Sequence, residues 1–177
     1  MPHDGIRRQG MALSDRQKVA WLRLIRSDNI GPVTFRELIN HYGSAEKALE
    51  ALPELSRRGG SSRSLRIATQ AEAESEIDTA DRFGAHFVGI GEPDYPPALR
   101  HVDGAPPLLA MKGSGAAATR PSIGIVGSRN ASINGAKFAA MLAHDCGRAG
   151  YTIASGLARG IDAAAHRASL STGTVAM

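Results

Sequence analysis

The feature that most constrains the fold of this chain is an alternation of strand-like and helix-like segments that begins at Ser122. Short apolar runs rich in β-branched residues alternate there with longer segments of helical periodicity, and glycines lie between them. We expect strands at 123–126, 151–154 and 174–176, separated by helices at 135–148 and 160–170. This order predicts an α/β fold, with a Rossmann-like, doubly wound parallel sheet and right-handed connections.

Within this predicted domain, the first helix is expected to direct Phe138, Leu142 and Cys146 toward the sheet, and the strand at 123–126 is expected to be buried. The chain stops at Met177, inside the third predicted strand. A three-stranded sheet that ends there would have one uncovered flank. We therefore expect the Rossmann-like domain to be incomplete and the chain to be a fragment of a longer protein.

The two turns that follow the first two predicted strands carry the most informative chemistry. In a parallel sheet such turns lie at one edge, where helix amino termini direct N–H groups and a positive dipole at a ligand. Glycines permit close approach of the backbone, and serine and arginine suit phosphate. The predicted phosphate-binding residues are Gly127, Ser128 and Arg129 in the first turn, and Ser155, Gly156, Arg159 and Gly160 in the second. We call these two turns the phosphate cradle. In a purely structural alternative, the glycines only let strands turn into helices and both arginines are solvated.

Other kinds of site find little support in the sequence. The patterns GxGxxG and GxxxxGK[ST] do not follow Val126, which disfavours nicotinamide dinucleotides and ordinary nucleoside triphosphatases. Ser128 and Ser155 lie outside a GxSxG pattern, so no catalytic residue is predicted. We expect Asp162 to complement the dipole of the second helix and His166 to make a structural hydrogen bond. The six histidines and one cysteine lack zinc-site spacing, so neither a metal nor a cofactor is expected.

The residues before the sheet are predicted to form a tail, a helical domain and a connector. The helical domain has three short helices, and we expect Ser44 to cap the third and Pro53 to end it. The connector starts with a polar helix from about Ser64 to Arg82 and continues with strands. The predicted domains are a flexible tail at 1–14, a helical domain at 15–63, a connector at 64–121 and the Rossmann-like domain at 122–177.

Charge is unevenly distributed along the sequence. Residues 1–70 contain 12 Lys or Arg and 7 Asp or Glu, whereas residues 71–177 contain 9 and 10. A basic helical front end is compatible with binding to a phosphate backbone, although ordinary solvation produces the same surplus. No apolar run approaches the roughly 20 residues of a membrane span, and no leader opens the chain, so we expect a cytoplasmic protein.

The turns and their surroundings resemble those of the DNA-processing protein A (DprA) family, also called Smf. The resemblance starts with Ile-Val-Gly127-Ser128-Arg129 and the long pattern Ser155-Gly156-Leu-Ala-Arg159-Gly160-Ile-Asp162-Ala-Ala-Ala-His166. In the connector it includes Asp94-Tyr95-Pro96-Pro97 and Pro106-Pro107. In the front end, Ile30-Gly31-Pro32 and His41-Tyr42-Gly43-Ser44 are similar to the family's SAM-like, helix-hairpin-helix domain.

This resemblance implies a single-stranded DNA-binding protein that protects incoming DNA and loads the RecA recombinase during natural transformation and homologous recombination. It also implies a homodimer, whose interface we expect to lie mostly outside this fragment, and no enzymatic activity. The later strands of the family's sheet, and the winged helix that many members carry, lie beyond what this sequence matches.

Two other functions stay open at this point. A Rossmann-like nucleotide or phosphoribosyl hydrolase would use the same phosphate cradle, but it needs a carboxylate or a metal there, and the visible carboxylate is Asp162. Alternatively, the helical domain is chiefly a protein-interaction module. Its hairpin at Ile30-Gly31-Pro32 lacks a second glycine two residues on, which weakens the case for capture of a duplex phosphate.

Overall fold

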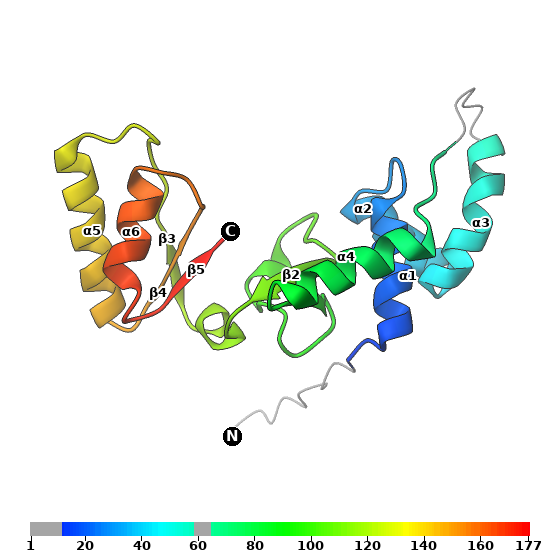
Figure 1. The fold of residues 1–177 in the computed structure, drawn as a ribbon, viewed down its shortest axis with the longest axis horizontal. Helices are drawn as coiled ribbons and strands as arrows, with labels where there is room; N and C mark the ends of the chain where they lie inside the picture. The colour runs from blue at the N-terminus through cyan, green and yellow to red at the C-terminus, as the bar shows by residue number, and fades with distance from the viewer. Residues whose placement is uncertain (1–11, 59–64) are drawn as a thin grey trace, which may run out of the picture. The chain divides into compact units, whose positions relative to one another are not determined.

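The structure, a computed structural model, describes residues 12–58 and 65–177. It divides into two compact units, residues 1–113 and 114–177 (Figure 1). The predicted α/β class is confirmed, with a helical domain first and a small parallel sheet after it. Most of the predicted tail and the predicted boundary at 63/64 lie outside the described residues.

Three short helices open the first unit, as predicted, and local signals set their ends. Ser14 forms a capping box with Gln17 at the start of the first helix, and Gly43 ends the second with φ 81°. Ser44 Oγ accepts a hydrogen bond from Lys47 N at 3.3 Å, so the predicted cap of the third helix is confirmed. The helices are α1 (Asp15–Arg26), α2 (Pro32–Tyr42) and α3 (Ala45–Arg58).

The prediction that Pro53 ends the third helix is wrong, because α3 continues to Arg58 with Pro53 inside it. Proline removes one helical N–H and clashes with the preceding turn, at a cost of about 3 kcal/mol. The buried side chains of Leu49 and Leu52 anchor α3 in the core just before the proline. The Pro53 carbonyl accepts a hydrogen bond from Arg57 Nε at 3.3 Å.

The polar helix α4 (Gln70–Arg82) begins later than predicted, since residues 65–69 are not helical. Leu65 and Ile67 alternate along this segment, and both contact the core of the three helices. Its backbone bonds to the end of α1, because Ala68 N donates to Ser27 Oγ at 3.1 Å. A capping box then starts α4, with Thr69 as the N-cap. Contacts with α1 and with the core of the three helices therefore hold residues 65–69 in a non-helical conformation, although the sequence placed part of this segment in a helix.

The connector shares a core with the helical domain. Leu22 of α1, Ala73 of α4 and Phe87 of the first strand form one buried cluster. The two strands, β1 (Ala85–Gly89) and β2 (Leu108–Lys112), pair antiparallel with Phe87 opposite Ala110. The connector strands thus belong to the same compact unit as the helical domain, and this unit ends at residue 113.

Tyr95 is the largest fully buried side chain among residues 12–58 and 65–177, and removing its hydroxyl is expected to lower the stability measurably. Its hydroxyl donates to Pro106 O at 2.8 Å, and burial raises the pKa of this phenol, so the donor stays protonated. We expect Tyr95→Phe to lower the free energy of unfolding by about 1 kcal/mol, measured by urea denaturation. The control is Tyr42→Phe, because the Tyr42 hydroxyl has no hydrogen-bond partner among the described residues. Equal losses in both variants would contradict this assignment.

The second unit is a three-stranded parallel sheet in the order β3-β4-β5 (Figure 1). Ile123 is in register with Ile153, and Ile153 with Thr174. Ala143 and Ala165, one from each helix, close over Ile153 in a shared core, so both helices cover one face of the sheet. The elements are β3 (Ser122–Gly124), α5 (Ile133–Arg148), β4 (Thr152–Ser155), α6 (Ile161–Ser169) and β5 (Thr174–Ala176).

The predicted inward face of the first of these helices is wrong. Phe138 is 58% exposed and Leu142 40% exposed, whereas Ala139, Ala143 and Gly147 are buried. A Cβ atom on Gly147 would overlap Thr172, so the backbone approaches its neighbours too closely for large side chains. Cys146 does pack against the core. Val126, expected in a buried strand, is 84% exposed because it lies beyond β3, in the turn.

Candidate phosphate-binding site

The first turn of the phosphate cradle is exposed and closely approached by the second. A Cβ atom on Gly127 would lie 2.6 Å from a side-chain carbon of Ile161, so this position requires glycine. Ser128 and Arg129 are exposed. Ser128 Oγ accepts a hydrogen bond from Asn130 N at 3.1 Å, which orders the turn and leaves the hydroxyl hydrogen directed elsewhere. Arg129 makes no side-chain hydrogen bond or ion pair with the described residues.

Ser155 is buried, unlike the exposed Ser128, Arg129 and Arg159 of the predicted site. It lies at the end of β4 and is 2% exposed, and its Oγ donates to Ile125 O at 2.6 Å. The hydroxyl hydrogen therefore ties the end of β4 to the end of β3. In this geometry Ser155 supports the phosphate cradle from within and does not present its hydroxyl to solvent.

Gly160 joins the two turns. It precedes α6 with φ 86° and ψ −124°, a conformation reserved for glycine. A Cβ atom on Gly160 would lie 2.6 Å from Arg129 O, and it would overlap Ser128 O as well. Ile161 N also donates to Ser128 O at 3.2 Å. The structure thus brings together two turns that are about 30 residues apart in the sequence, as expected for successive strands of a parallel sheet.

Asp162 and His166 hold the second turn from behind. Asp162 is 7% exposed, and its Oδ2 accepts a hydrogen bond from Ala158 N at 3.3 Å. His166 Nε2 lies 2.9 Å from Gly156 O, and because a carbonyl only accepts, this nitrogen carries a proton. His166 Nδ1 lies 2.7 Å from Thr174 Oγ1. Both side chains are engaged in contacts within the fold.

The amino terminus of α6 leaves backbone donors for a ligand. No side chain caps this helix. The N–H groups of Asp162 and Ala163 have no hydrogen-bond acceptor among the described residues. Arg159, which precedes them, is exposed and has no side-chain partner in the described part of the chain. Two free N–H groups, a helix dipole and two unpaired guanidinium groups make this edge attractive to anions.

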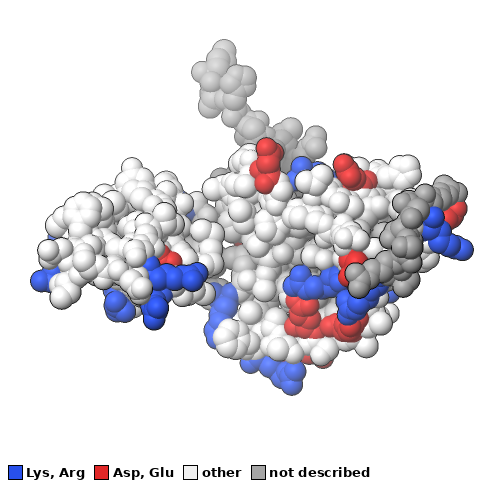
Figure 2. All heavy atoms as spheres, turned by 90° about the horizontal axis from the view of Figure 1, so that it is seen from above, with Lys and Arg blue, Asp and Glu red and all other residues white. Residues whose placement is uncertain are grey.

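The surplus positive charge belongs to the unit that carries the phosphate cradle. Residues 114–177 contain six Lys or Arg and two Asp, a net charge of +4, whereas residues 1–113 contain 15 of each sign. On the face drawn in Figure 2, blue side chains gather along one edge of this unit with little red beside them. Residues 1–70 keep their surplus of positive charge, but the acidic residues of α4 and of the connector belong to the same compact unit, which is neutral as a whole.

One arginine of this unit has a role that the sequence does not reveal. Arg120 Nε donates to Thr152 Oγ1 at 3.0 Å, and its Nη2 donates to Thr172 O at 2.6 Å. Arg120 therefore fastens the amino end of the sheet, opposite to the phosphate cradle. No sequence pattern marks it, since its partners are distant in the chain.

Residues 12–58 and 65–177 contain neither a membrane-spanning helix nor a cluster of metal ligands. Every helix there is too short or too polar to cross a membrane. Nowhere in the same ranges do three His, Cys, Asp or Glu side chains gather closely enough to hold a metal ion.

The profile of the family described as DNA recombination-mediator protein A matches residues 86–177, more than half of the chain. The chain belongs to this DprA family. A profile described as the DprA-like N-terminal HHH domain matches residues 15–79. The family resemblance predicted from the two turns, the connector and the front end is therefore confirmed.

Individual DprA relatives agree with this assignment. Protein Smf from Synechocystis is 27% identical over 168 residues, 89% of this chain and 42% of that protein. Protein Smf from Escherichia coli is 32% identical over 104 residues, 59% of this chain and 28% of that protein. DNA processing protein DprA from Bacillus subtilis is 35% identical over 88 residues, 49% of this chain and 30% of that protein. The chain thus spans less than half the length of these relatives.

A solved structure shares the fold. The X-ray structure of DprA from Streptococcus pneumoniae superimposes with a TM-score of 0.59 at 24% identity, over 94% of this chain and 57% of that one.

Proposed function

We propose that the phosphate cradle binds the backbone of single-stranded DNA. The observation that carries this proposal is the contact between the two turns, which sets exposed Arg129 and Arg159 beside the uncapped start of α6. Arginine forks onto phosphate oxygens, and free N–H groups at a helix start bind anions. The net charge of +4 on this unit adds a long-range attraction for a polyanion.

The contacts of this site are of the kind that positions a strand without reading its sequence. Phosphate contacts carry no base information by themselves. Aromatic residues make up 5% of the chain, so stacking of bases on exposed rings is a minor contribution. We therefore expect DNA binding with little sequence preference.

The wider role follows from the family and is part of the same proposal. Relatives of this chain are named DNA processing protein and DNA recombination-mediator protein. We infer that the complete protein protects incoming DNA and loads the RecA recombinase, acts as a homodimer in the cytoplasm, and does not catalyse a reaction.

A hydrolase is the competing function, and the position of Asp162 argues against it. Its carboxylate is buried and accepts the Ala158 N–H, so it lies behind the turn as a structural support. A hydrolase would need a carboxylate or a metal beside the bound phosphate. We expect no release of base or phosphate when the chain is incubated with nucleoside monophosphates. Turnover that Asp162→Asn abolishes, in a variant that stays folded, would favour the hydrolase.

The proposed function is tested by titrating labelled oligonucleotides with the chain at several salt concentrations. We expect single strands to bind more tightly than duplexes of the same length. The logarithm of the binding constant should fall linearly with the logarithm of salt concentration, by about 0.7 for each neutralised phosphate of a single strand. An affinity that does not change with salt concentration, or a clear preference for duplex DNA, would overturn the proposal.

A further inference from the structure

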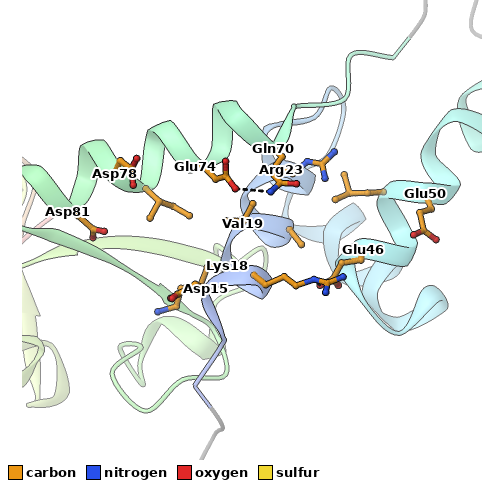
Figure 3. Close-up of a pocket in the computed structure, with 14 residues that line it drawn as sticks. Asp15, Lys18, Val19, Arg23, Glu46, Glu50, Gln70, Glu74, Asp78 and Asp81 are labelled. Carbon is orange, nitrogen blue, oxygen red and sulfur yellow. Dashed lines mark hydrogen bonds and ion pairs between the residues drawn. The ribbon is translucent and has the colours of Figure 1, made fainter.

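A groove of about 880 Å³ lies in the first unit, between α1, α3 and α4 (Figure 3). It is unrelated to the phosphate cradle, because all of its lining residues lie between 15 and 81. Its apolar lining comes from all three helices: Val19 and Ala20 of α1, Leu49 of α3 and Ile77 of α4. The bottom of the groove is therefore an apolar surface, here called the floor, which can receive one or two apolar side chains.

Carboxylates line both walls of this groove. Glu46 and Glu50 come from α3, and Glu74, Asp78 and Asp81 follow one face of α4 (Figure 3). With Asp15 the lining contains six carboxylates and three cations. The groove is thus acidic although its unit is neutral as a whole, with 15 charges of each sign.

The three cations offset only part of the charge of the six carboxylates. Lys18 Nζ lies 3.8 Å from the buried carboxylate of Glu92, outside the groove. Arg23 Nε donates to Ala68 O at 3.1 Å. Arg16 reaches Glu46 only at 4.0 Å, and its side chain is 88% exposed, where such a pair contributes little.

As a result, the outer carboxylates lack a counter-charge. Glu50, Asp78 and Asp81 are exposed and form no ion pair with any described residue. Like charges that face one another across a groove repel, and an incoming cation relieves that repulsion. The same field repels nucleic acid, so this face of the first unit does not suit DNA.

We propose that this groove docks a lysine- or arginine-rich segment of a partner protein, with an apolar side chain seated on the floor between the acidic walls. The acidic walls favour a basic partner by charge complementarity. The apolar floor favours a segment that also carries an apolar side chain over a simple cation. A groove between helices is a common site for an amphipathic segment, whose apolar ridge lies inward and whose basic flanks meet the rims. This inference does not depend on the proposed DNA function, since the two surfaces belong to different units.

The test uses a fluorescein-labelled, 16-residue peptide of lysine, leucine and alanine that places leucines on one helical face. Fluorescence anisotropy with the 177-residue chain at physiological salt should show saturable binding. The double variant Glu50→Lys/Asp78→Lys should weaken this binding at least tenfold. The matched control Glu37→Lys/Asp103→Lys changes the net charge by the same amount at exposed sites outside the groove, and it should change binding less than twofold.

The other outcomes have defined meanings. Equal losses in both double variants, or equal binding of a peptide with glutamate in place of lysine, would overturn the proposal. Competition by trilysine as strong as that of the full peptide would overturn it in favour of a small-cation site. A labelled single-stranded oligonucleotide that, with no peptide present, binds the Arg129→Ala/Arg159→Ala variant and shifts the NMR signals of the groove residues would show that nucleic acid occupies the groove, and this also would overturn it.

Discussion

Replacing Gly160 with Ala is expected to destabilise the sheet unit by about 4 kcal/mol, because strained backbone and steric overlap combine at this position. Its φ of 86° and ψ of −124° lie in a region that alanine avoids. The new methyl group would also meet Arg129 O at 2.6 Å and overlap Ser128 O. Both are backbone atoms, so no side-chain rotation relieves the overlap. The start of α6 would have to move away from the first turn.

Urea unfolding followed by circular dichroism measures this loss, and Gly150→Ala is the matched control. Gly150 also has a positive φ, 95°, but a Cβ atom there meets nothing within 4 Å. Its replacement should therefore cost only about 1 kcal/mol, from backbone strain alone. Similar losses in the two variants would show that the two turns do not approach each other as described.

Replacing Arg129 or Arg159 with Ala should weaken single-stranded DNA binding by about 1 to 3 kcal/mol each, the cost of a lost charge-assisted phosphate contact. Each change should also reduce the salt dependence by about one counterion. Folding should be unaffected, since both side chains are exposed and make no contact that the described fold depends on. Because the turns touch, we expect the double variant to lose most of its affinity.

The control for these variants is Arg167→Ala, an exposed arginine in the last turn of α6, away from the phosphate cradle. It removes the same charge from the same unit and should have a much smaller effect. Folded Arg129→Ala and Arg159→Ala proteins with unchanged affinity and salt slope would leave the two turns with a structural role only.

Much of the fold follows from local sequence, because its signals act over a few residues. The capping box at Ser14, the left-handed Gly43 and the cap at Ser44 set helix ends by hydrogen bonds within one turn. The alternation of strand and helix after Ser122 predicts a parallel sheet, and in such a sheet successive turns share an edge. The sequence alone was therefore enough to predict that the turn containing Arg129 and the turn containing Arg159 meet at that edge.

Which surfaces face one another was decided by tertiary structure. On α5, Phe138 and Leu142 recur with the same spacing as Ala139 and Ala143, so periodicity alone gives two possible inward faces. The close approach of α5 and α6 selects the small residues, because only they allow two backbones to come together. The same limit applies to Ser155, whose partner Ile125 O is 30 residues away. Side-chain hydrogen bonds and packing between distant segments depend on how those segments meet, and no local pattern encodes that meeting.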